Sequence, residues 1–86
     1  MARIRIEDHR IVLAPGADPV IELVVGGAVA GRCRFHAQAA PDRRATRDFE
    51  TGFVELHYDV GDYERVRDLL RGNRVVWVGE DLALEA

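Results

Sequence analysis

The chain has 86 residues, which is enough for one hydrophobic core, so we expect a single domain over residues 1–86. Its hydrophobic content of 48% and charged content of 31% exclude a disordered chain, and a formal net charge of −3 disfavours nucleic acid as a partner. The single cysteine, Cys33, excludes an internal disulfide, and without a long apolar run or a signal peptide the expected location is the cytoplasm, away from membranes.

The first nineteen residues predict a short hairpin followed by a loop. Residues 3–7 alternate between apolar and charged side chains, which is typical of a half-buried strand. Asp8 and His9 are interpreted as a tight turn, and residues 10–13 as the strand that returns. Residues 14–19 contain two prolines and a glycine, a composition that predicts a loop.

A second hairpin is predicted around Gly26 and Gly27. Two strand-like segments, residues 20–25 and 28–37, lie on either side of this pair. Two adjacent glycines suit a type I′ turn because both of its central residues need positive φ.

Residues 38–52 show no periodicity and contain Pro41 and charges of both signs. Unstructured connections of this length are uncommon within a compact domain. We expect a flexible connecting loop, with a short helix over residues 43–49 as the alternative.

The C-terminal part predicts a strand, a helix and a strand. Residues 53–60 alternate again, and Gly72 is expected at the C′ position, directly after the last residue of the helix that follows. Residues 74–78 predict a strand that is apolar on both faces, and residues 82–85 a last short strand. Apolar side chains at helical spacing form the stripe that should lie on the sheet: Tyr63, Val66, Leu69 and Leu70.

Alternation gives two of the predicted strands a buried and a wet face. Within residues 28–37, Cys33 and Phe35 lie on the face that we expect to be buried. Within residues 53–60, Val54 and Leu56 lie on the face that we expect to be buried. The opposite faces carry polar and charged side chains: Arg32, Arg34, His36, Glu55, His57 and Asp59.

The predicted fold class is α+β, with a mainly antiparallel sheet of five to seven short strands and one amphipathic helix packed on one face. The helical link between residues 53–60 and 74–78 allows a parallel crossover or an antiparallel return, and it favours the parallel pairing.

A metal or catalytic site is one hypothesis for function. His36, His57 and Asp59 would converge if their strands were adjacent and in register, and such a set can bind a divalent metal. No recognised metal-ligand spacing supports it. Cys33 is better interpreted as a buried apolar residue, because strand parity separates it from His36. A serine nucleophile is excluded, since the chain has no serine.

Nucleic-acid binding is a second hypothesis. Every basic residue is an arginine, and several fall on one strand face and in the following loop. Arginine forks suit phosphates, but the aromatic side chains are not interleaved with them, and the alternative is a wet strand face paired with Glu22 and Glu55. The arginines concerned are Arg32, Arg34, Arg43, Arg44 and Arg47.

Our preferred hypothesis is a non-enzymatic protein–protein interaction or assembly module without a cofactor. Residues 1–47 carry a net charge of +3 and residues 48–86 carry −6, a polarity that favours association unless the two halves interleave in one sheet. We expect a homodimer that also binds a further, unknown protein. Candidate contact residues are Arg32, Arg34, His36, Arg43, Arg44, Arg47, His57 and Trp77, the last on a strand with an exposed apolar face.

Overall fold

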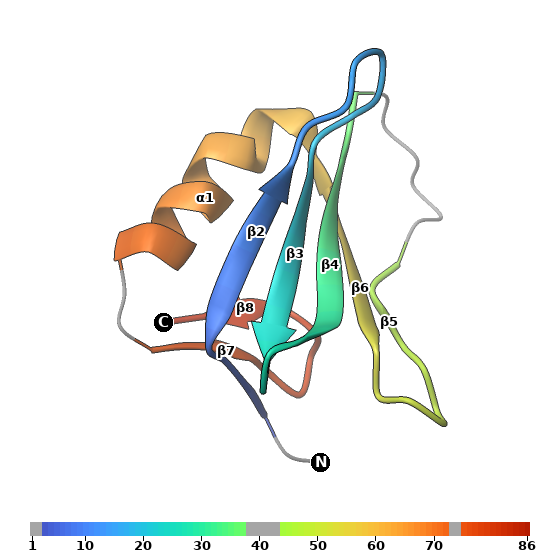
Figure 1. Cartoon of the computed structure of the whole chain (residues 1–86), viewed down its shortest axis with the longest axis vertical. Coiled ribbons are helices and arrows are strands. Elements are labelled where there is room, and N and C mark those ends of the chain that lie inside the picture. Colours follow the sequence, from blue (N-terminus) through green and yellow to red (C-terminus); the bar gives the residue numbers. More distant parts are fainter. Residues whose placement is uncertain (1–2, 38–43, 73–74) are drawn as a thin grey trace.

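The computed structural model describes residues 3–37, 44–72 and 75–86. Within these ranges the chain forms eight strands and one α-helix, which a short 3₁₀ turn precedes (Figure 1). The elements in chain order are β1 (Ile4–Ile6), β2 (Asp8–Val12), β3 (Val20–Val25), β4 (Ala28–His36), β5 (Thr46–Arg47), β6 (Val54–Asp59), η1 (Val60–Asp62), α1 (Tyr63–Gly72), β7 (Val76–Val78) and β8 (Leu84–Glu85).

The described strands form two sheets. The five-stranded sheet has the order β2-β3-β4-β6-β5, and the three-stranded sheet has the order β1-β7-β8. Every pairing is antiparallel except that of β4 with β6, which is parallel. The expected α+β class with mainly antiparallel pairing is confirmed, although the strands number eight and divide between two sheets.

The expected turn at Asp8 and His9 is wrong, because both residues lie within β2. β1 continues almost directly into β2, and the amide of Glu7 donates to the carbonyl of Val24 over 3.0 Å. The side chains facing the core change parity here: Ile6 is buried in β1, whereas Ile11 packs on the core from β2. A regular strand cannot change parity, so the chain bends and passes from one sheet to the other.

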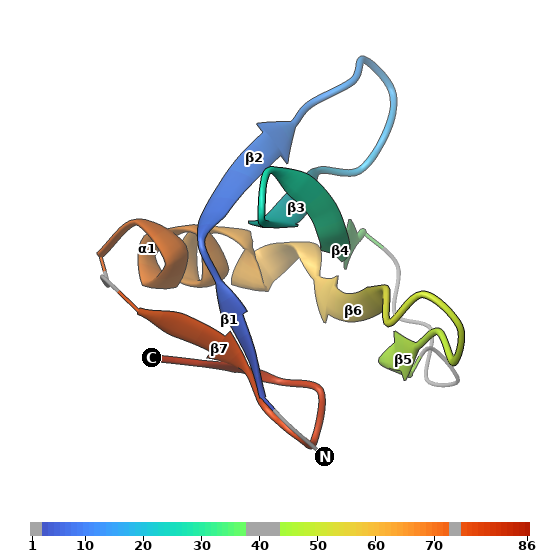
Figure 2. The ribbon, with the colours of Figure 1, turned by 60° about the horizontal axis from the view of Figure 1, so that its bottom comes forward.

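The strand–helix–strand unit also differs from both expected arrangements. β6 and β7 belong to different sheets, so α1 connects the two sheets and makes neither a parallel crossover nor an antiparallel return. The parallel pair is instead β4 and β6. After β4 the chain returns along the far side of β6 as β5, which leaves β6 between them (Figures 1 and 2).

The sequence predicts a flexible loop, or a short helix over residues 43–49, between β4 and β6. Thr46 and Arg47 form β5 and pair with Glu55 and Val54 of β6, so the helix is wrong there. Residues 38–43 lie outside the described residues. The glycine turn between β3 and β4 is confirmed, with φ of 61° at Gly26.

The core lies between the sheets and α1, which covers only one face of the five-stranded sheet (Figure 2). Val66 and Leu70 are the buried residues of α1, and Gly72 is its last residue and not the one after its end. Phe35 of β4 lies edge-on to Tyr63, with ring centroids 5.2 Å apart. The buried hydrophobic residues are Ile6, Ile21, Leu23, Cys33, Phe35, Val54, Leu56, Val66, Leu70, Val76 and Val78.

Candidate functional site

The candidate site is the outer face of the five-stranded sheet, which we define as the face turned away from α1. The expected alternation is confirmed: Cys33 and Phe35 are fully buried on the inner face, and the alternate residues Arg32, Arg34 and His36 are only partly buried. In the strand register Arg32 stands beside both Glu22 of β3 and Glu55 of β6. No helix in the described ranges covers this face.

Carboxylates pair with two of the arginines on the outer face, Arg10 and Arg34. Nε of Arg34 lies 3.0 Å from Oε1 of Glu55, and the two side chains are 39% and 32% exposed. The hydrogen bond from Arg34 lowers the pKa of Glu55, with a partial opposing effect of burial. Arg10 pairs with Glu22 over 3.5 Å on the same face. The outer face is therefore a mosaic of paired charges and not a purely basic surface.

The parallel register brings His36 and His57 together. Nε2 of His36 lies 2.9 Å from Nδ1 of His57, and the rings stack with centroids 5.2 Å apart. One facing nitrogen must donate a proton while the other accepts it, so the pair holds one proton between these two atoms. Asp59 stands opposite His36 in the register.

The histidine pair supplies two nitrogen ligands for a metal. Structural zinc sites in proteins are usually four-coordinate, and catalytic ones use three protein ligands. Among the residues described, no group of three or more His, Cys, Asp or Glu side chains is arranged to hold an ion. The geometry thus supports the metal hypothesis only through this pair.

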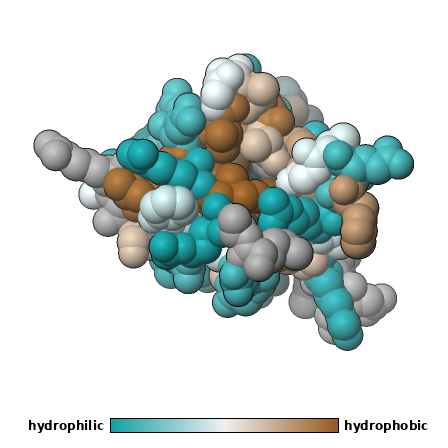
Figure 3. Space-filling model, turned by 90° about the horizontal axis from the view of Figure 1, so that it is seen from below, coloured by the Kyte–Doolittle hydropathy of each residue, from teal (hydrophilic) through white to brown (hydrophobic). Residues whose placement is uncertain are grey.

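Four large apolar side chains stay exposed on the described surface. Phe49 is fully exposed, Leu13 is 69% exposed, and Val12 and Val60 are 41% and 42% exposed. The surface view of one end of the molecule shows hydrophobic residues interspersed with hydrophilic ones (Figure 3). Val12 and Leu13 follow one another at the end of β2, where the sequence Ile11-Val12-Leu13 could have signalled an exposed apolar residue, because alternation cannot bury all three.

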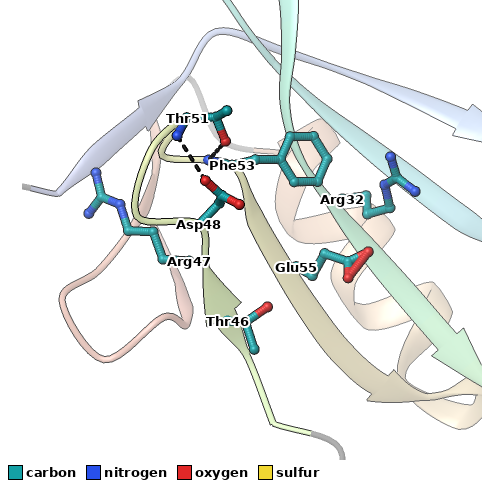
Figure 4. Close-up of a pocket in the computed structure, with 7 residues that line it drawn as sticks. All are labelled: Arg32, Thr46, Arg47, Asp48, Thr51, Phe53 and Glu55. Atoms are coloured by element: carbon teal, nitrogen blue, oxygen red, sulfur yellow. Dashed lines mark hydrogen bonds between the residues drawn. The ribbon is translucent and has the colours of Figure 1, made fainter.

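A groove of about 590 Å³ lies on the outer face beside β5 (Figure 4). Phe53 points toward Arg32, whose guanidinium carbon is 5.0 Å from the ring centroid. Nε of Arg32 is buried and has no hydrogen-bond partner among the described residues. The groove is lined by Arg32, Thr46, Arg47, Asp48, Thr51, Phe53 and Glu55.

The turn that bounds this groove is held by Asp48. Its carboxylate accepts hydrogen bonds from the amides of Thr51 and Glu50, over 2.9 and 2.8 Å. These bonds lower the pKa of Asp48. One wall of the groove is therefore fixed by local backbone bonds, and its lining carries charges of both signs.

The other predicted contact residues are dispersed. Arg47 lines the groove, Arg44 is exposed before β5, and Arg43 lies outside the described residues. Trp77 belongs to the three-stranded sheet, where the guanidinium carbon of Arg3 lies 4.7 Å from its ring centroid. The structure thus joins the two histidines and the β4 arginines on one face and places Trp77 in the other sheet.

Cys33 occupies the core. Burial raises the pKa of its thiol to about 12, so the sulfur stays protonated at neutral pH. A buried, protonated thiol is a poor nucleophile, which agrees with the interpretation of Cys33 as a core residue.

Comparison of the chain with known protein families, with curated proteins and with solved structures found no match. None of the described helices has the length and apolar character that a membrane crossing requires.

Proposed function

We propose that the protein is a non-enzymatic protein–protein interaction module that self-associates and presents the outer face of its five-stranded sheet to a further protein. One observation carries this proposal: α1 covers the inner face, while the outer face keeps paired charges, an arginine stacked on Phe53 and a groove. Arginine and aromatic side chains are enriched in protein interfaces.

The same geometry weakens the nucleic-acid alternative. Arg34 and Arg10 have carboxylate partners on the outer face. Arg32 lies against the ring of Phe53, which occupies the surface on which a base would stack. The net charge of −3 adds long-range repulsion of phosphates.

The chemistry of the described side chains also favours binding over catalysis. The thiol of Cys33 is buried and protonated. His36 and His57 share a hydrogen bond and stand on a sheet face away from any nucleophile of the core. Neither arrangement pairs a nucleophile with a base.

An affinity capture with matched variants tests the proposal. Thr46→Arg introduces a long side chain at the groove, and Asp81→Arg changes the net charge more strongly on the exposed β7–β8 turn. We expect nuclease-treated lysate to give a protein that the wild type and Asp81→Arg retain and Thr46→Arg loses. Equal capture by all three proteins, or loss of the captured species on nuclease treatment, would contradict the outer-face proposal.

A further inference from the structure

β2 is an outermost strand of the five-stranded sheet in the described part of the chain (Figure 2). It has five residues, Asp8–Val12, and contains no proline. Natural edge strands are commonly protected by proline, lysine, bulges or very short length, because their free N–H and C=O groups can pair with another strand. β2 has none of these four features and carries only the charges of Asp8 and Arg10, which are opposite in sign, whereas β5 at the opposite edge has only two residues.

The register identifies which backbone groups of β2 face the open edge. The amide of Phe35 in β4 donates to the carbonyl of Pro19, just before β3. Since the backbone N–H and C=O groups of alternate residues point to opposite neighbours, those of the odd-numbered residues of β3 point toward β4 and those of the even-numbered residues point toward β2. The even residues of β3 stand opposite Asp8, Arg10 and Val12. The backbone groups of the alternate residues, His9 and Ile11, therefore face outward.

A hydrogen bond agrees with this assignment. The amide of His9 donates to Oδ1 of Asp8, a side-chain acceptor of its own strand, over 2.8 Å. This side-chain contact caps a donor that would otherwise meet only water. The cap is exposed and involves neighbouring residues, so another acceptor can replace it.

We propose that a second copy of this chain pairs with β2 through its own β2, antiparallel and about a twofold axis at His9. The two five-stranded sheets then form one continuous sheet. This inference rests on the self-association in the proposed function and assigns its surface. Strand addition of this kind uses main-chain hydrogen bonds for affinity.

The charges of Asp8 and Arg10 favour a twofold axis at His9 over one at Arg10. Opposite residues of an antiparallel pair share a face, so a twofold axis normal to the sheet must pass through a residue pair of equal number. An axis at Arg10 sets two arginines against each other. An axis at His9 sets Asp8 opposite Arg10 of the second copy, and symmetry repeats this pair.

The pairing also gives the outward backbone groups of His9 a partner. The amide of His9 leaves Asp8 for the carbonyl of His9 in the second copy, and the released carboxylate meets the opposing Arg10. Val12 and Leu13, which are exposed, lie at the end of the same seam. A groove of about 280 Å³ beside the edge offers space for inward-facing side chains of the added strand, and it is lined by Ile6, Glu7, Asp8, His9, Leu70, Arg71 and Val76.

Sedimentation equilibrium of the full chain tests the pairing. We expect the wild type to form dimers as concentration rises. His9→Pro removes an amide that points away from β3, so the fold is kept, as circular dichroism can verify. Two symmetry-related hydrogen bonds are lost, and we expect the dissociation constant to rise roughly tenfold or more.

Charge exchange tests the register independently. Asp8→Arg alone sets arginine against Arg10, and Arg10→Asp alone sets aspartate against Asp8, so each variant should be monomeric. An equimolar mixture should form a heterodimer, because both cross-strand pairs are then of opposite charge. A wild-type monomer at every concentration would overturn both this pairing and the proposed self-association. A dimer that His9→Pro leaves unchanged, or charge variants that fail to associate when mixed, would overturn the β2 pairing alone.

Discussion

The two faces of β4 differ in exposure and in chemistry. On the inner face, Cys33 and Phe35 have no solvent exposure and lie in the core that α1 closes. On the outer face, Arg34 and His36 stay partly exposed and form polar contacts with β6. One strand of nine residues thus contributes one set of side chains to the core and presents another, polar set on the outer face. The loss of stability caused by a substitution in β4 should therefore depend on whether the residue lies on the inner or the outer face.

The strongest test of this contrast compares adjacent residues. Phe35→Ala removes a fully buried ring that contacts Tyr58 and Tyr63, and it should lower the free energy of unfolding by about 3–5 kcal/mol. His36→Ala, one residue further along, should cost no more than about 1 kcal/mol. Urea unfolding monitored by circular dichroism measures both. Similar losses of stability would contradict the claim that the inner face of β4 contributes much more to stability than the outer face.

A substitution at Gly31 tests how closely β4 and β6 approach each other at the pair Gly31 and Val54. A Cβ at this position would clash with Cγ2 of Val54 and lie 2.7 Å from the carbonyl oxygen of the same residue. Gly31→Ala should therefore destabilise the protein by about 1–3 kcal/mol through overpacking. Gly61→Ala is the matched control, since nothing lies within 4 Å of its added Cβ. Equal midpoints for the two variants in thermal unfolding would refute this close contact.

The smallest effect is expected on the outer face. A double-mutant cycle with Arg34→Met and Glu55→Gln should give a coupling energy below about 1 kcal/mol, because both side chains are partly exposed. Arg34 lowers the pKa of folded Glu55, so the coupling is complete above the unfolded carboxyl pKa and is lost as pH falls through the lowered value. Urea unfolding at neutral and acidic pH measures this. A coupling that grows in acid would contradict the assigned pair.

Local patterns in the sequence were enough for several elements. The alternation of Cys33 and Phe35 with charged residues predicted the buried face of β4, since side chains along a strand alternate strictly. Gly26 and Gly27 predicted their turn because few other residues adopt its dihedral angles. The stripe through Val66 and Leu70 predicted the face of α1 that packs on the core.

Pairing between distant segments could not be read in this way. The parity change between Ile6 and Ile11 indicates a break, but a bend and a tight turn satisfy it equally until the partner strands are known. β5 has two residues and no period, and it becomes a strand only through its pairing with β6. Which strand forms an edge is likewise a property of the whole sheet.

For the candidate site too, local patterns predicted some features, and others depend on the pairing of distant strands. The outward position of Arg32, Arg34 and His36 followed from alternation. The contact of His36 with His57 requires β4 and β6 to be neighbours, and the sequence alone could only assume this adjacency. The stacking of Arg32 on Phe53 and the groove beside it depend on the returning hairpin of β5 and escaped prediction.

The burial of Cys33 turns the chain's only sulfhydryl into an internal reporter of opening. A thiol-modifying reagent can reach it only when the core separates, so the labelling rate should follow the population of opened molecules. Air oxidation cannot link two intact copies through this residue. Any dimer that survives in the native protein without reductant is accordingly a non-covalent one.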